Sequence, residues 1–343
     1  MRPSFFQHLH PPSIPAPQAR FRHTLGAGGL SVYLILVLIL SGVLEMFYYI
    51  PTPEQAALSI QTLSYLVPFG GFVRNIHYWA AQLLVAVASL HFLRVLFTGA
   101  YAPPRRLNYL IGLGLFVLVL FLDFSGYILR WDDGIRWALI AGTNLLKTIP
   151  VFGDYLYQLV TGSSSPGPTT LIRFYTWHVF GLTLALIIIS VWHLFRVRRD
   201  GGIAVPPPGL RLDQNRIPRG ELVRREVVAA IFAAVLLVFL ASFFPAPIAP
   251  PMESTPLDLV DSRAPWFFMW VQQLLRWGDP FLFGIVVPLG IIAIFALIPY
   301  LFPKPIPGEW GKWLPRSGRS AQVVAGIIAI TLLMLTFLYL ISY

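Results

Sequence analysis

Long apolar blocks separated by short polar segments dominate the chain. Blocks of about 18 or more apolar residues are long enough to cross the hydrocarbon core of a bilayer as a helix. The polar arm before the first block lacks the apolar core and cleavage site of a signal peptide, so we expect that block to remain as a span. The pattern predicts seven spans, at residues 28–49, 76–97, 107–129, 171–195, 222–244, 280–302 and 321–342.

The composition agrees with a membrane protein. Of the 343 residues, 56% are hydrophobic and 12% are charged, whereas a soluble domain averages about a quarter charged residues. The sequence therefore predicts an all-α integral membrane fold of seven transmembrane helices, with a four-helix bundle that binds cofactors followed by three C-terminal helices. Membrane lipid is the expected surroundings of these helices.

The distribution of basic residues predicts the orientation. Most of the 25 Lys and Arg residues lie in the N-terminal arm and in the loops after spans two, four and six. The positive-inside rule places these segments in the cytoplasm, with the C-terminus outside, in a bacterial cytoplasmic membrane. The net charge of +10 thus reflects topology, and we expect no nucleic-acid partner.

Proline-rich polar segments divide the chain. We expect a cytoplasmic arm over residues 1–27, a four-span domain over 28–200, a linker over 201–221 and a three-span domain over 222–343. Short helices are predicted at 135–148 and 155–160, in the segment between spans three and four.

Four histidines lie inside spans two and four. His77 and His91 are 14 residues apart, and His178 and His193 are 15 apart. Each pair falls near one face of its helix, separated by about 21–23 Å. Since both spans run in the same direction, His77 lies level with His178, and His91 with His193. Two facing imidazoles suit six-coordinate haem iron that transfers electrons. Packing histidines are the alternative, but buried ionisable groups in two matched pairs favour two haem b groups.

Glycines repeat at nearly the same interval in the flanking spans. Gly28 and Gly42 in span one, and Gly112 and Gly126 in span three, are each 14 residues apart. A flat macrocycle between helices needs positions without a side chain. These glycines are therefore expected to bind the cofactors.

Three arginines are candidates for the anionic haem propionates. Arg74 and Arg173 precede the outer histidines, and Arg94 follows His91. Each can pair with a propionate at its own level. A topological role is the alternative for Arg94, but it does not explain the two outer arginines.

The chain contains no cysteine. Disulfides, thiolate metal sites, iron–sulfur clusters and covalently attached haem are therefore excluded within it. A third haem could be held only noncovalently.

Motifs across most of the chain resemble the cytochrome b subunit of the bc1 and b6f quinol-oxidising complexes. The matching stretches are Arg74-Asn75-Ile76-His77, His91-Phe92-Leu93-Arg94, Ser125-Gly126-Tyr127-Ile128-Leu129-Arg130-Trp131, Thr143-Asn144-Leu145-Leu146 with Ile149-Pro150, and Thr170-Leu171-Ile172-Arg173-Phe174. The resemblance implies that His77 and His178 hold the outer, low-potential haem iron and that His91 and His193 hold the inner, high-potential one. The seven spans and the 15-residue spacing are similar to the b6f type, here fused into one chain.

The resemblance also implies two quinone sites. Where the family has Pro-Glu-Trp-Tyr at the outer quinol pocket, this chain has Ala264, Pro265, Trp266 and Phe267, so the glutamate that accepts a proton is missing. Asp123, at the outer end of span three, is our candidate replacement; capping, or pairing with Arg130 or Arg136, is the alternative. The other carboxylates on the outer side are Asp132, Asp133, Asp258 and Asp261. The inner quinone site is expected near His23, Arg196 and Arg198.

By resemblance, the function is proton-translocating quinol:acceptor oxidoreduction in a respiratory or photosynthetic chain. One electron would go to a Rieske iron–sulfur partner and on to a cytochrome c-type subunit, and the other would cross both haems to a quinone. A homodimer is implied by the family. The alternatives are a haem b anchor that links a dehydrogenase or hydrogenase to the quinone pool, and a transporter or structural subunit without redox activity.

Overall fold

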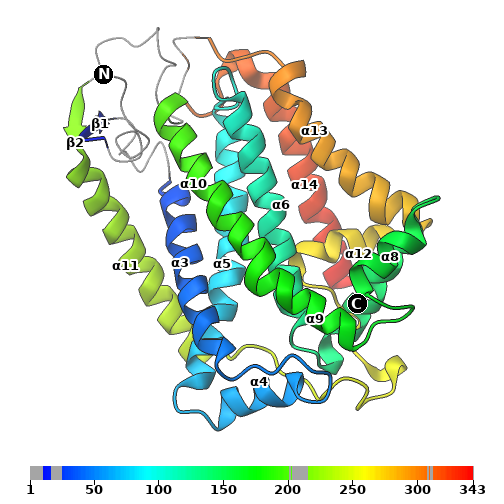
Figure 1. The fold of residues 1–343 in the computed structure, drawn as a ribbon. Helices are drawn as coiled ribbons and strands as arrows, with labels where there is room; N and C mark the ends of the chain where they lie inside the picture. The colour runs from blue at the N-terminus through cyan, green and yellow to red at the C-terminus, as the bar shows by residue number, and fades with distance from the viewer. Residues whose placement is uncertain are drawn as a thin grey trace.

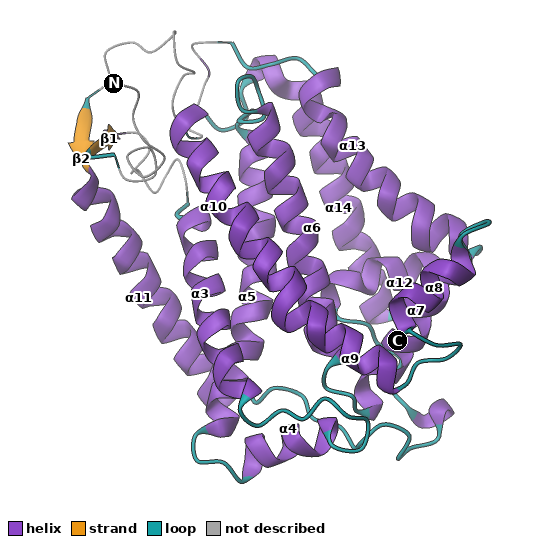
Figure 2. Cartoon of the chain, in the orientation of Figure 1, coloured by secondary structure: helices purple, strands orange, loops and turns teal. Residues whose placement is uncertain are grey.

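The computed structural model describes residues 11–16, 25–200, 202, 215–306, 309 and 312–342. Helices make up most of this part (Figure 2). Within it, seven helices are long and apolar enough to span a membrane, which confirms the predicted all-α membrane fold. They run over Ala27–Met46, Gly70–Phe97, Arg106–Ile128, Pro168–Asp200, Arg219–Phe243, Leu282–Leu301 and Arg316–Ile341.

The first four spans form the central bundle (Figure 1). They are α3 (Ala27–Met46), α5 (Gly70–Phe97), α6 (Arg106–Ile128) and a composite span of α9 (Pro168–Thr176), the π-turn η3 (Trp177–Gly181) and α10 (Leu182–Asp200). Helix α5 packs against α3 and α6, and α10 packs against α6. The two histidine-bearing helices therefore face each other between two glycine-bearing helices.

Several spans begin earlier than the apolar pattern predicts, and the second and fourth show why. Helix α5 starts at Gly70, where a Cβ would lie 2.1 Å from the carbonyl oxygen of Leu63, so only glycine fits this close approach. Helix α9 starts at Pro168, and the Thr170 hydroxyl accepts a hydrogen bond from the Gly167 N–H. Proline at a first helical position needs no N–H partner. Both starts depend on local backbone geometry that hydropathy does not register.

The π-turn explains the unequal histidine spacing. Residues 177–181 form a π-turn that contains His178. Such a turn inserts one residue into a helix without adding a full turn. The 15-residue interval from His178 to His193 thus matches the 14-residue interval in the uninterrupted α5.

The three C-terminal spans flank the bundle from two sides (Figure 1). They are α11 (Arg219–Phe243), the π-turn η6 (Leu282–Val286) with α13 (Val287–Leu301), and α14 (Arg319–Ile341). Helix α11 packs against α3 and α5, whereas α13 packs against α6 and α14 packs against α5. Large apolar side chains such as Phe232, Val235 and Ile330 are exposed on these helices, as lipid-facing residues are in membrane proteins.

The predicted short helices are present as α7 (Arg136–Lys147) and α8 (Gly153–Thr161). The sequence did not predict α4 (Ala56–Tyr65), α12 (Met269–Leu275) or the antiparallel pair of β1 (Ser13–Pro15) and β2 (Arg216–Pro218). That pair joins the arm to the linker through a distant partner, which a local pattern cannot reveal. Single 3-10 turns complete the description: η2 (Asp133–Ile135), η4 (Leu257–Leu259), η5 (Trp266–Phe268) and η8 (Arg316–Gly318).

Candidate functional site

The bundle brings the four predicted histidines together in two pairs. The ring centroids of His77 and His178 lie 6.4 Å apart, with an angle of 69° between the ring planes. His91 and His193 line one cavity farther along the bundle. We call these positions the His77 level and the His91 level.

The spacing at the His77 level fits an iron between the rings. A metal–imidazole nitrogen bond is about 2 Å long, and a ring centre lies about 1 Å behind its nitrogen, so two axial imidazoles have centroids roughly 6 Å apart. The observed 6.4 Å agrees with that value. Direct ring packing would not require this separation.

Each histidine faces a glycine on a neighbouring helix. A Cβ added to Gly42 would lie 3.1 Å from Cε1 of His77, and one added to Gly126 would lie 2.6 Å from Cε1 of His178. At the other level, the corresponding distances are 3.4 Å from Gly28 to His91 and 3.1 Å from Gly112 to His193. The missing side chains thus leave room beside every imidazole, as a flat cofactor between the helices requires.

Serine hydroxyls orient the imidazoles at the His77 level. Ser41 Oγ lies 2.9 Å from His77 Nδ1 and donates to the Val37 carbonyl, so it accepts from the ring. Ser125 Oγ lies 3.0 Å from His178 Nδ1 and donates to the Leu122 carbonyl. With Nδ1 protonated, Nε2 keeps the lone pair that a metal needs. These bonds therefore favour the tautomer whose Nε2 would be able to bind an iron.

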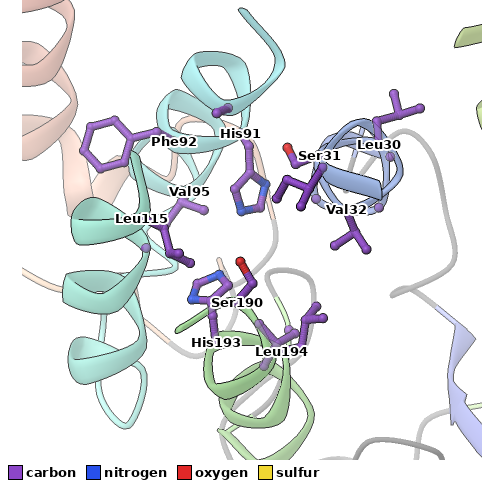
Figure 3. Close-up of a pocket in the computed structure, with 18 of the residues that line it drawn as sticks. Leu30, Ser31, Val32, His91, Phe92, Val95, Leu115, Ser190, His193 and Leu194 are labelled. Atoms are coloured by element: carbon purple, nitrogen blue, oxygen red, sulfur yellow. The ribbon is translucent and has the colours of Figure 1, made fainter. Parts of the chain in front are cut away.

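The His91 level opens into a cavity of about 300 Å³. Figure 3 shows the rings of His91, from α5, and His193, from α10, pointing toward one another across it, with Ser31 and Val32 of α3 beside them. Nδ1 of His91 is buried, and no described residue forms a hydrogen bond with it. The cavity extends past the histidines to Arg198 and Glu226.

The three predicted propionate arginines contact protein groups. Arg74 donates to the carbonyls of Ala246 and Pro247, and Arg173 donates to the carbonyls of Gln158 and Leu159 at the end of α8. Arg94 is fully buried, with its guanidinium 4.1 Å from the centre of the Trp313 ring. Their role toward propionates stays a prediction.

The predicted inner quinone residues are only partly described. His23 lies outside the described residues, as do His8, His10, Arg20 and Arg22. Arg196 forms a 2.9 Å ion pair with Asp200. Arg198 is the predicted residue that lines the cavity at the His91 level.

Asp123 and the motif around Trp266 lie close together. The indole Nε1 of Trp266 donates to Gln82 Oε1 at 2.8 Å, and Gln82 Nε2 lies 3.4 and 3.5 Å from the two Asp123 oxygens. Phe267 is 8% exposed and packs within the bundle core, in ring contact with Phe268. The structure thus connects two parts of the predicted quinol site through Gln82, a residue that was not predicted.

The arginines that could have neutralised Asp123 are engaged elsewhere. Arg130 pairs with Asp132 at 2.7 Å, and Arg136 lies 3.4 Å from Asp133. Asp132 and Asp133 also accept backbone N–H groups of residues 249, 253 and 255, which fixes the segment after α11 across this end of the bundle. Asp261, in turn, pairs with Arg263.

Sequence reasoning missed four polar residues near this end: Ser41, Ser125, Gln82 and Glu45. The two serines carried a signal, since each directly precedes a glycine of the predicted cofactor slots. Glu45 also carried one, because a carboxylate inside an apolar span is costly and usually has a role. Its Oε1 is buried and has no hydrogen-bond partner among the described residues. Gln82 carried no signal that distinguishes it from an ordinary polar residue.

Comparison with known proteins identifies relatives of the first half of the chain. Residues 14–201 match the family Cytochrome b/b6/petB. The chain is 39% identical to cytochrome b6 of Heliomicrobium gestii over 183 residues, which cover 52% of this chain and 86% of that protein. It is 37% identical over 175 residues to the menaquinol:cytochrome c reductase cytochrome b subunit of Geobacillus thermodenitrificans, covering 51% of this chain and 78% of that protein.

A solved structure extends the likeness into the second half. A chain of a hyperthermophilic respiratory Complex III superposes with a TM-score of 0.78 and 22% identity, covering 92% of this chain and 83% of that one. This match establishes a shared fold over the C-terminal spans. The family match covers more than half of the chain and includes all four histidines. The chain therefore belongs to the cytochrome b/b6 family and is a multi-pass membrane cytochrome b of the bc1 and b6f type.

Proposed function

We propose that the chain is the dihaem cytochrome b subunit of a quinol-oxidising bc-type complex. The observation that carries this proposal is the repeated arrangement at two levels, where each of four histidines faces a glycine of a neighbouring helix. One such pair could serve packing alone. Two pairs stacked along one bundle provide two redox positions across the membrane.

The protein's own groups would hold the two haems. At the His77 level, Nε2 of each ring is left free to bind iron because Nδ1 donates to a serine. When bound, haem b supplies a one-electron carrier that needs no open coordination position. Arg74, Arg94 and Arg173 are proposed to neutralise the propionates after releasing part of their present contacts.

The quinol-oxidation site is proposed around Pro265, Trp266, Phe267 and Asp123. Pro265 begins the 3-10 turn η5, and Trp266 is 42% exposed at its start. Oxidation of a quinol breaks two O–H bonds, and Asp123 would accept one of these protons. The relative from Geobacillus is named for menaquinol and cytochrome c, which supports a menaquinol-type substrate and a cytochrome c-type acceptor here.

A Rieske iron–sulfur protein and a cytochrome c-type subunit are the proposed partners, in a homodimeric complex. Because the chain has no cysteine, an iron–sulfur cluster must come from another subunit. The His91 level is proposed to lie on the cytoplasmic side of a bacterial cytoplasmic membrane. The part of its cavity beyond the histidines, toward Arg198 and Glu226, would take the quinone that receives the second electron and protons. Quinol oxidation on the opposite side would then contribute to a proton gradient.

The experiment that tests the proposal is to purify the complex through a tag on this chain. We expect two haem b per chain that dithionite reduces and that titrate at two different midpoint potentials. We also expect a copurifying Rieske protein and quinol:acceptor turnover. A haem b membrane anchor would instead copurify with a dehydrogenase or hydrogenase. Absence of haem absorption bands would reject both redox functions.

A further inference from the structure

Asp123 is a partly buried carboxylate that accepts hydrogen bonds from an amide. It lies on α6, one residue before Phe124, whose ring packs 5.8 Å from that of Phe268. Among the described residues no arginine or lysine forms an ion pair with it. A carboxylate in a membrane span without a cation is unusual and normally functional.

The hydrogen bonds around Gln82 have a fixed direction. An indole N–H can only donate, so the bond from Trp266 identifies the carbonyl end of the Gln82 amide. The NH2 end must then point at Asp123, where it donates to the carboxylate oxygens at 3.4 and 3.5 Å. A donor aimed at a carboxylate favours the ionised form, which is the form that can accept a proton.

The bonds orient Asp123 but do not conduct its proton. Neither an indole N–H nor an amide is an exchangeable acid or base near neutral pH. Tyr78, on the neighbouring helix α5, is a titratable group on which the Asp123 charge acts. Proton release must therefore use a route other than Gln82 and Trp266.

The geometry points to Gln82 as a positioning residue of the quinol-oxidation site, holding the Asp123 carboxylate as proton acceptor and linking its orientation to Trp266. This inference rests on the proposed function. In the step concerned, one quinol O–H bond breaks and an O–H bond forms on Asp123. The other quinol proton and one electron would leave to the Rieske partner, and the second electron would pass to the haem proposed at the His77 level.

The test is a double-mutant cycle in the purified complex with Gln82→Leu and Asp123→Asn. We expect Asp123→Asn to lower kcat by about 100-fold, as removal of a general base does. Gln82→Leu should lower kcat by about tenfold, leave KM within about threefold, and move the acidic limb of the pH–rate profile to higher pH because the carboxylate loses its donor. In the Asp123→Asn background, Gln82→Leu should change kcat by less than about twofold.

Trp266→Phe tests the hydrogen bond from the indole to Gln82. It should lower kcat by a few-fold and move the pH profile in the same direction as Gln82→Leu, since the amide loses the bond that fixes its orientation. Two matched controls remove comparable bonds elsewhere: Trp79→Phe, whose indole donates to the Phe244 carbonyl, and Gln61→Leu, whose amide donates to the Ala249 carbonyl. Both controls should keep the wild-type pH profile.

Haem content separates failure of this inference from failure of the proposed function. If the wild-type complex lacks two haems or quinol turnover, the proposed function fails. Suppose instead that the wild type is active and that the haem spectra are intact in every variant. The inference would then be overturned if the double variant lowered kcat by the product of the two single-variant decreases, because Gln82 and Asp123 would then act independently. An unchanged pH profile in Gln82→Leu would overturn it as well.

Discussion

The two levels of the bundle share one scaffold and differ in the groups around it. At each level, two histidines from α5 and the fourth span face two glycines from α3 and α6. At the His77 level the residues before these glycines are Ser41 and Ser125, whereas at the His91 level they are Ala27 and Ile111. The Gly–His pairs thus form a slot at both levels, and the residues that precede the glycines determine whether the imidazoles are fixed by hydrogen bonds.

The groups next to the imidazoles also differ between the two levels. The imidazoles at the His77 level have hydrogen-bonded Nδ1 atoms, whereas those at the His91 level border a cavity of about 300 Å³ that continues to Arg198 and Glu226. A level with fixed ligands suits electron transfer with little reorganisation. The extension of this cavity beyond the two rings, toward Arg198 and Glu226, would suit a small molecule such as a quinone.

Removing one histidine is the strongest test of the two-level arrangement. We expect His178→Ala to abolish haem binding at the His77 level and to leave about one haem per chain, because a six-coordinate iron loses one of its two protein ligands. His193→Ala is the matched variant and should remove the other haem. Redox titration of the reduced-minus-oxidised absorbance measures both. Retention of two unaltered haems in His178→Ala would refute the pairing.

Replacing a glycine by alanine should lower haem affinity most where the added Cβ would lie closest to a histidine ring. A Cβ at Gly126 would lie 2.6 Å from His178, whereas one at Gly28 would lie 3.4 Å from His91, an ordinary contact. Overpacking costs about 1–3 kcal/mol, so Gly126→Ala should lower haem affinity at its level by about tenfold or more. Gly28→Ala should bind haem normally. Haem titration into the apoprotein compares the two, and equal losses would show that the slots are not shaped as described.

The sequence predicted those features that repeat along the chain. Seven long apolar blocks specify seven helices, and matched His and Gly intervals specify two levels, because one residue interval corresponds to one distance along a helix. The structure confirmed the fold class, and the family match confirmed the resemblance.

Features that depend on distant partners could not be predicted. The hydrogen bonds of Gln82 join α5 to α6 and to a turn 184 residues later. The π-turn at His178 and the short helices α4 and α12 likewise have no long hydropathy pattern. Asp123 could be proposed from sequence because a carboxylate in a span is conspicuous, whereas a glutamine is not.

Removing the serines should change the potential of one haem only. Ser41→Ala and Ser125→Ala each delete a hydroxyl that accepts from Nδ1, although the Leu122 carbonyl, 3.0 Å from His178 Nδ1, remains in Ser125→Ala. Both variants should therefore reduce the electron donation of the imidazoles to iron, Ser41→Ala more strongly. If about half to one kcal/mol of differential stabilisation is lost, the midpoint potential at the His77 level should rise by roughly 20–40 mV. Ser31→Ala, on α3 near the other level, is the control, since its hydroxyl bonds the Ala27 carbonyl. A shift of both haems would show that the serines act on the whole bundle.

The smallest expected effect comes from two tyrosines at opposite ends of the bundle. Tyr49 donates to the Leu129 carbonyl at 2.8 Å, and Tyr101 donates to the Pro303 carbonyl at 3.3 Å. Burial raises the pKa of Tyr49 well above its usual value and raises the pKa of Tyr101 to about 12. Since each folded-state pKa exceeds the unfolded value of about 10, the stabilisation is complete below pH 10 and is lost as the pH rises through the folded-state pKa.

We therefore expect Tyr49→Phe to destabilise the complex by about 1 kcal/mol at pH 8, and Tyr101→Phe by less, because its bond is longer. The rate of haem release on heating measures both, since membrane complexes unfold irreversibly. Phenylalanine keeps the ring that packs 5.7 Å from Tyr175, so the comparison isolates the hydroxyl of Tyr49. Between pH 10 and 12 the wild type should approach its variants, because only the wild type has a phenol to ionise on unfolding. If the difference in haem-release rate between the wild type and its variants stayed constant over this range, the phenols would stabilise the two ends by packing alone.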